Sequence, residues 1–236
     1  MYKIDGYENY NEYESMSIED SNRFIRKAFL HSIGGVLLSC IVAVYLLFFN
    51  RALFLNILQS FYFIIIIQLG LAFVFSIFLQ KLSTIATVLL YYAYAAFTGA
   101  TFAVIGAIYT VDSILIALAV TLTLFILLAI YGFMTKEDLS GYGRYLRVAL
   151  FAVIIFSIAN IFLKLPALYW GITFGAIVVF SGLIAYDVNR IKRLSTELVY
   201  DNPAMKDKLS IMMAFNLYLD FVNLFIYILR ILGRRK

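Results

Sequence analysis

Cysteine and histidine are almost absent from this chain, and their scarcity excludes several kinds of site. The 236 residues include one cysteine, Cys40, and one histidine, His31. A lone cysteine cannot form an intramolecular disulfide. There is no cluster of His and Cys ligands for zinc, no Cys–His pair, and no histidine base positioned by a motif to activate a serine. We therefore expect no enzymatic activity, no resident cofactor and no nucleic-acid partner.

Charge and proline are also scarce, which points to lipid as the solvent. Charged residues make up 14% of the chain and hydrophobic residues 64%, with two prolines and a mean hydropathy of +0.92. A soluble domain has roughly 45–50% apolar and about 25% charged residues. The chain is long enough for one domain, and most of that domain must lie in a bilayer.

Seven apolar runs cover most of the sequence, and each approaches the roughly 20 residues that a helix needs to cross about 30 Å of hydrocarbon. Open strands would leave backbone groups unpaired in lipid, so the runs predict helices. The sequence therefore predicts an all-α membrane protein with seven transmembrane helices over residues 23–236, preceded by a polar, flexible or interfacial tail at 1–22. The runs are 29–49, 57–79, 84–109, 113–134, 146–164, 167–190 and 209–231.

The distribution of Lys and Arg predicts the orientation. With the N-terminus in the cytoplasm, thirteen basic residues fall in inner segments and six in outer segments, as the positive-inside rule requires. The basic C-terminal segment then lies outside. A re-entrant last segment would bring it inside, but 209–231 contains no glycine or proline at which to turn. We therefore expect seven full spans.

Small residues suggest where helices pack closely. Ala95, Gly99, Ala103 and Gly106 form a small face on the third expected span, and Gly171 and Gly175 form a small-xxx-small pair on the sixth. Such faces let helix backbones approach each other in membranes. We expect close packing at both places.

One face of the last apolar run is polar. Asn216, Asp220, Asn223 and Tyr227 are spaced i, i+4, i+7 and i+11, so they share one side of a helix. A charged carboxylate that faces lipid costs roughly 2.5–3.5 kcal/mol or more. The stripe should therefore face the protein interior or line a path through it.

Asp187 is the other acid embedded in a long apolar run, and it is the candidate partner of Asp220. Asp220 lies about 16 Å beyond Leu209 along a helix, at about 1.5 Å per residue. The two acids meet only if the sixth helix continues through Val188–Leu194, which snorkelling Arg and Lys side chains permit. Two adjacent carboxyl groups tend to share a proton, and when ionised they repel and can bind a hard cation such as calcium. The alternatives are an interhelical polar clamp and two separate interfacial acids.

Three stretches carry a resemblance to a known family: Ala185–Lys192, Leu217–Phe225 and Thr135–Ser140. Together, and in this order along the chain, they resemble the Bax inhibitor-1 family, also called the transmembrane Bax inhibitor motif family, over roughly residues 23–233. The resemblance implies six helices around a central C-terminal helix, and a pH-sensitive calcium leak. It also implies that Asp187 and Asp220 form the pH-sensing pair and that Lys81 is the latch to Asp187. From their spacing, Asn216, Asn223 and Tyr227 are expected to line the pore, and the two acids are expected to be transient calcium ligands.

The resemblance leaves a second function open. Some bacterial members modulate a membrane-bound protease, and the family name comes from suppression of cell death, so the chain could be a non-transporting regulator. An intramembrane aspartic protease has the right residue types, but no Gly-Asp setting surrounds either acid. The short loops favour a multi-pass protein of a bacterial plasma membrane, with calcium ions, protons and lipid as its partners.

Overall fold

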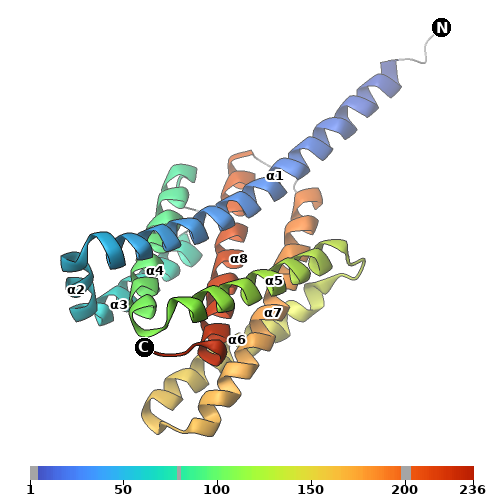
Figure 1. The fold of residues 1–236 in the computed structure, drawn as a ribbon. Coiled ribbons are helices and arrows are strands. Elements are labelled where there is room, and N and C mark those ends of the chain that lie inside the picture. Colours follow the sequence, from blue (N-terminus) through green and yellow to red (C-terminus); the bar gives the residue numbers. More distant parts are fainter. Residues whose placement is uncertain (1–4, 79–80, 198–202) are drawn as a thin grey trace.

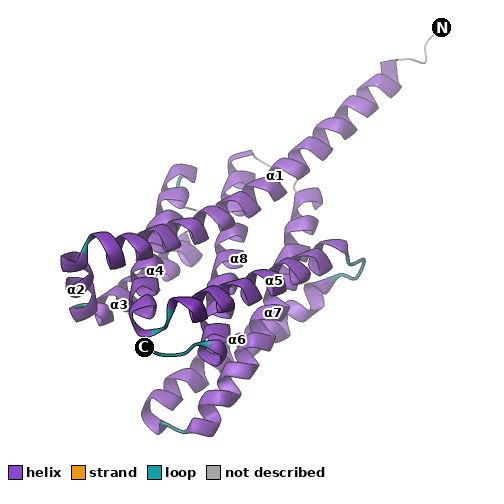
Figure 2. Ribbon diagram, in the orientation of Figure 1, coloured by secondary structure: helices purple, strands orange, loops and turns teal. Residues whose placement is uncertain are grey.

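Helices make up almost all of the chain in the computed structural model, which describes residues 5–78, 81–197 and 203–236 (Figure 2). No strand occurs in these ranges apart from one isolated bridge between Tyr109 and Arg235. A five-residue π-helix, Tyr45–Phe49, extends α1, and a short 3₁₀ turn, Leu139–Gly141, precedes α6. The α-helices are α1 (Asp5–Val44), α2 (Arg51–Gln59), α3 (Phe61–Phe78), α4 (Thr84–Ile108), α5 (Val111–Met134), α6 (Tyr142–Leu163), α7 (Pro166–Glu197) and α8 (Pro203–Leu232).

Local sequence sets the ends of the helices. The side chains of Ser83 and Thr110 cap α4 and α5 by accepting hydrogen bonds from backbone amides three residues later. Helix α6 ends where Lys164 adopts a left-handed conformation with φ 53°, and Pro166 begins α7. The short connection makes α6 and α7 antiparallel neighbours, whereas α4 and α5 diverge from their turn and do not pack along each other.

The predicted all-α membrane fold is confirmed, with one difference in the second span. Six helices are long and apolar enough to cross a bilayer, and the number is seven if the bent pair α2–α3 counts as one span. These two helices meet at an angle of 80° around Ser60. The sequence predicted one continuous helix over 57–79. Gln68 joins α3 to α4, since its side chain donates to Thr98 at 3.1 Å and accepts from Thr101 at 3.0 Å.

Helix α8 lies at the centre of the bundle, as predicted. Two thirds (67%) of its most apolar window is buried, against 6% for α6. It packs against α1, α4, α5 and α7, while α3 packs on α4 and α6 packs on α7 (Figure 1). The apolar side chains of α8 contribute to three of the core clusters. Burial on nearly all sides explains why α8 can carry polar residues within the membrane.

The C-terminal segment returns beside the turn between α4 and α5 (Figure 1). The Thr110 amide donates to the carbonyl of Arg234 at 3.0 Å, and the Lys236 amide donates to that of Ile108 at 2.9 Å. Because α8 runs unbroken for 30 residues, about 45 Å, it crosses from one end of the bundle to the other. The re-entrant alternative is therefore wrong.

Helix α1 projects beyond the bundle at its N-terminal end (Figure 1). Its 40 residues would extend about 60 Å, roughly twice the hydrocarbon thickness. The helix continues across the expected boundary between residues 22 and 23. The division into a tail at 1–22 and a domain at 23–236 stays a prediction.

Candidate functional site

The polar stripe of α8 lines a cavity of about 580 Å³. Asn216, Asn223 and Tyr227 are half-buried, whereas Leu217 and Leu224 on other faces are fully buried. The cavity lies between α8, α6 and α7, with Leu69 of α3 and Tyr94 of α4 also on its wall. All four stripe residues face this one hollow, together with Asp187.

Asp187 and Asp220 come together because α7 continues beyond residue 190, where the sixth apolar run ends. The helix runs on to Glu197, which keeps Asp187 inside the bundle and level with Asp220. The carboxyl groups are close enough to interact directly, and the two residues are 5% and 6% exposed. Asp220 Oδ2 is buried and has no hydrogen-bond partner among the described residues. A buried carboxylate oxygen without a partner is costly, so this atom is suited to bind a proton or a cation.

Two arginines, which the sequence reasoning treated only as orientation signals, face the acid pair. Arg190 of α7 and Arg147 of α6 both line the cavity. Arg190 lies three residues after Asp187, a spacing that places both on one helix face. Arg147 is held in position because its Nε donates to the Gly143 carbonyl at 3.1 Å. Both guanidinium groups therefore belong to the same hollow as the acid pair.

The structure does not bring Lys81, the predicted latch, to Asp187. Lys81 is exposed, its Nζ lies 5.9 Å from the centre of the Phe78 ring, and it does not line the cavity. It follows α3, which packs on α4 and not on α7. Among the described residues, the cations that line the cavity with Asp187 are Arg190 and Arg147.

Tyr227 marks the end of the stripe nearest the C-terminus. Its ring stacks on Phe180 at 6.0 Å between centroids, and the guanidinium carbon of Arg230 lies 4.7 Å from its centroid. Arg230 is held in turn by Tyr169, at 4.7 Å, and by Thr173, to which it donates at 3.3 Å. Aromatic and cationic groups therefore close this end of the polar stripe.

The loop before α6 is fastened to α7 near the acid pair. Asn189 accepts from the Leu139 amide at 3.3 Å and donates to the carbonyls of Gly132 and Glu137 at 3.2 and 3.4 Å. Arg193 forms an ion pair with Asp138. Two of the stretches that carry the family resemblance are thus one structural unit, which fixes the part of α7 that follows Asp187.

A resident calcium ion of the EF-hand type is held by several acidic side chains together with amide and carbonyl oxygens, 6–8 oxygens in all. The described lining of this cavity has two acids, Asp187 and Asp220. No group of three His, Cys, Asp or Glu side chains comes together within residues 5–78, 81–197 and 203–236. The other side-chain oxygens on the lining are those of the amides of Asn216 and Asn223 and of the hydroxyl groups of Tyr94, Ser157, Tyr186 and Tyr227.

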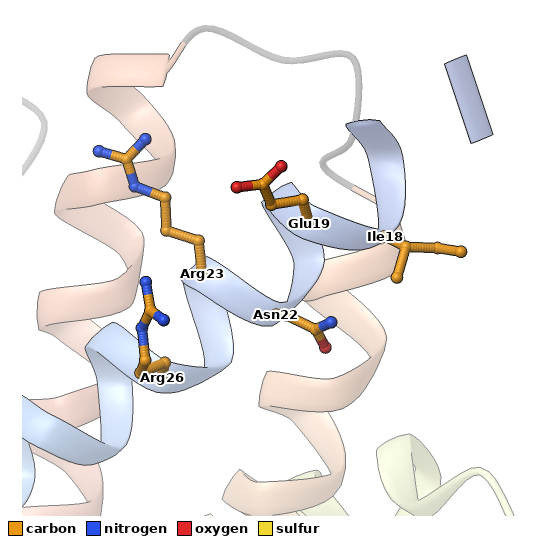
Figure 3. A pocket seen from close by; sticks show the side chains of 5 residues that line it. All are labelled: Ile18, Glu19, Asn22, Arg23 and Arg26. Atoms are coloured by element: carbon orange, nitrogen blue, oxygen red, sulfur yellow. The ribbon is translucent and has the colours of Figure 1, made fainter. Parts of the chain in front are cut away.

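A further hollow of about 440 Å³ lies along residues 18–26 of α1 and contains no comparable chemistry (Figure 3). Its described lining comes from α1 alone, and Figure 3 shows Arg23 and Arg26 extending from the same side of that helix. Glu19 is the one acid on this wall. The hollow is an open, basic surface and not an enclosed site.

Comparisons with known proteins agree with the resemblance found in the sequence. The model of the family described as "Inhibitor of apoptosis-promoting Bax1" matches residues 21–236. The chain is 39% identical over 211 residues to the inner membrane protein YbhL of Escherichia coli (strain K12), covering 86% of this chain and 87% of that one. It is 36% identical over 226 residues to an uncharacterized protein of Borreliella burgdorferi, covering 94% and 97%. An uncharacterized membrane protein of Streptococcus pyogenes serotype M3 is 34% identical over 217 residues, covering 90% and 93%.

Proposed function

The chain belongs to the Bax inhibitor-1 family of multi-pass membrane proteins, and from this premise we propose that it is a pH-sensitive calcium leak of a bacterial inner membrane. The gate is the pair Asp187 and Asp220, which share a proton in the closed state. The observation that carries the proposal is that both acids and the whole polar stripe of α8 face one cavity. The inner-membrane location rests on the printed name of the Escherichia coli relative.

The arginines supply an asymmetry between the two acids. Arg190 lies one turn after Asp187 on the same face of α7, so it favours charge on Asp187 over Asp220. In this proposal the shared proton belongs mainly to Asp220, and its loss places two negative charges side by side. Repulsion then separates α7 from α8, and the four carboxylate oxygens become available to a hard cation.

The remaining stripe residues would guide the ion along α8. Asn216 lies one turn before Asp220, and Asn223 lies about one turn after it, so amide oxygens flank the acid pair on the same face. Tyr227 and Arg230 form the barrier at the far end. We propose no catalytic step for the pair and no resident cofactor.

Calcium influx into liposomes tests the proposal. Wild-type protein should admit calcium at rates that differ between pH 6 and pH 8, and Asp220→Asn should abolish that difference, because an amide cannot exchange the proton. Asp112→Asn is the matched control, since it removes an exposed carboxyl group in the first turn of α5 and should leave the pH response intact. An unchanged pH response in both Asp187→Asn and Asp220→Asn would contradict the proposal.

A second function, regulation of a membrane-bound protease or of a stress or cell-death response, is favoured by the projecting end of α1. A helix that extends past the bundle offers a surface for another integral membrane protein. Deleting residues 1–17 keeps the contacts of Asp20 with Lys206 and of Ser21 with Ser195, so the bundle should remain folded. Loss of a co-purifying protease after this deletion would support regulation, and retained binding would count against the role of α1.

A further inference from the structure

A second cavity, of about 540 Å³, lies on a different face of α8 from the acid pair. Its walls come from α1, α4, α5 and α8, with Phe54 of α2 at one side. Phe221 and Phe225 form its deep wall, and Phe102 of α4 lies beside Phe225, with 5.5 Å between ring centroids. The cavity is thus mainly apolar and aromatic, and it takes no part in the proposed ion path.

The depth of this cavity corresponds to one leaflet of a bilayer. Phe221 lies 11 residues before Leu232, the last residue of α8, which is about 16 Å along the helix. Half of a hydrocarbon core of about 30 Å is about 15 Å. With Leu232 at the membrane surface, the cavity extends from the C-terminal end of the bundle to about the middle of the bilayer, which is the extent of an acyl chain in one leaflet.

Both charged residues on the wall are cations, and both lie at the end nearest the membrane surface. Arg51 is exposed at the first position of α2, and Lys236 is exposed beside the turn between α4 and α5. Lys236 Nζ donates to the Gly106 carbonyl at 2.8 Å, which fixes this ammonium at the mouth. None of the described lining residues is acidic. An apolar hollow with two cations at its mouth complements an amphiphile that has an anionic head.

We propose that this cavity binds one anionic phospholipid from the leaflet at the C-terminal end of the bundle. The phosphate group lies between Arg51 and Lys236, where charge-assisted hydrogen bonds are strong. One acyl chain extends between α1, α4 and α5 to Phe221 and Phe225. Because Phe221 directly follows Asp220, the lipid contacts α8 beside the acid pair, and its presence can bias the position of that helix.

Fluorescence quenching by brominated lipids tests the site. Trp170 is the one tryptophan of the chain and does not line this cavity, so Trp170→Phe combined with Phe54→Trp places a single reporter on the wall. In phosphatidylcholine vesicles, brominated phosphatidylglycerol at a low mole fraction should quench this reporter more than the same fraction of brominated phosphatidylcholine. Arg51→Gln with Lys236→Gln should reduce the preference by roughly fivefold or more for each cation removed.

The control removes the same charge from the same end of the bundle. Arg234 and Arg235 are exposed but do not line the cavity, so Arg234→Gln with Arg235→Gln should keep the preference. Ala107→Phe fills part of the cavity and should lower quenching by both brominated lipids. Circular dichroism and thermal unfolding of every variant exclude loss of the fold as the cause.

Three results would overturn the proposal. Equal quenching by the two lipids in the parent reporter protein would mean that the headgroup is not recognised. Quenching that Ala107→Phe leaves unchanged would mean that the acyl chain lies outside the cavity. A preference for brominated phosphatidylglycerol that Arg51→Gln with Lys236→Gln leaves unchanged would mean that these cations do not bind the headgroup.

Discussion

Asn189 shows how one side chain can fix a functional segment. Its amide joins the end of α5, the following loop and α7, and it is 7% exposed. A buried amide that satisfies three backbone groups at once is costly to replace, because each group would be left unpaired. The same contacts hold the part of α7 that follows Asp187 against the end of α5 and the loop after it.

Asp138, in the same loop, gives a prediction about acid stability. Hydrogen bonds from the hydroxyl and amide of Ser140 lower the pKa of Asp138 below 3.8, and the nearby Arg193 adds to the effect. A depressed folded-state pKa contributes stability above the unfolded value, and that stability is lost as the pH falls through the folded value. Asp138→Asn should therefore lower the unfolding temperature at pH 7, and the difference from wild type should shrink below pH 3.8.

Thermal unfolding of Asp138→Asn at several pH values checks this expectation. Glu137→Gln is the control, since Glu137 is exposed in the same loop and its side chain is not part of the Asp138 network. A difference from wild type that stays constant from pH 7 to pH 3 would show that Asp138 acts only through packing or shape.

At the scale of helices, small residues explain the close crossings of α4 with α1 and of α5 with α7. A third set of small residues, on α7, does not mark a crossing. A Cβ on Gly99 would lie 2.6 Å from the Cβ of Val42, and one on Gly132 would lie 2.3 Å from the carbonyl oxygen of Ala185. The small face on α4 therefore packs closely on α1, as predicted. Gly171 and Gly175 have nothing within 4 Å of such a Cβ, so the prediction of close packing there was wrong. A small-xxx-small spacing does not reveal whether the face meets a helix or lipid.

Gly132→Ala should destabilise the crossing of α5 and α7. The added methyl group meets backbone and not a flexible side chain, so the helices must separate, at a cost of about 1–3 kcal/mol. Gly175→Ala is the control: it adds a methyl group in open space and should be neutral or slightly stabilising, since alanine is the better helix former. Equilibrium unfolding in mixed micelles compares the two, and equal stabilities would contradict the packing argument.

Periodicity and hydropathy reveal some elements of this fold and hide others. The stripe on α8 follows from the helical period, and its inward orientation follows from the cost of a carboxylate in lipid. The bend between α2 and α3 could not be predicted, because 51–61 contains no proline or glycine and hydropathy sums do not detect a turn. The sequence did not place Arg147 and Arg190 at the site. The positive-inside rule explains why arginines occur at helix ends, but it contains no information about which side chains they face.

At the scale of the whole molecule, the path of the chain determines which segments share a side of the membrane. The C-terminal segment and the turn between α4 and α5 lie at one end, and the loop before α6 lies at the other. With the N-terminus cytoplasmic, a cysteine at Arg235 should react with a membrane-impermeant maleimide added to intact cells. A cysteine at Ser140 should react only after permeabilisation. Both are made in a Cys40→Ser background, and the reverse labelling pattern would invert the predicted orientation.

Coupling between the two acids is the central claim, and a double-mutant cycle measures it. The ratio of calcium influx at pH 8 to that at pH 6 is determined in liposomes for wild type, Asp187→Asn, Asp220→Asn and the double variant. Because a shared proton belongs to the pair, either single substitution should remove most of the pH response, and the double variant should add little. Independent effects that simply sum in the double variant would contradict a gate formed by Asp187 and Asp220 together.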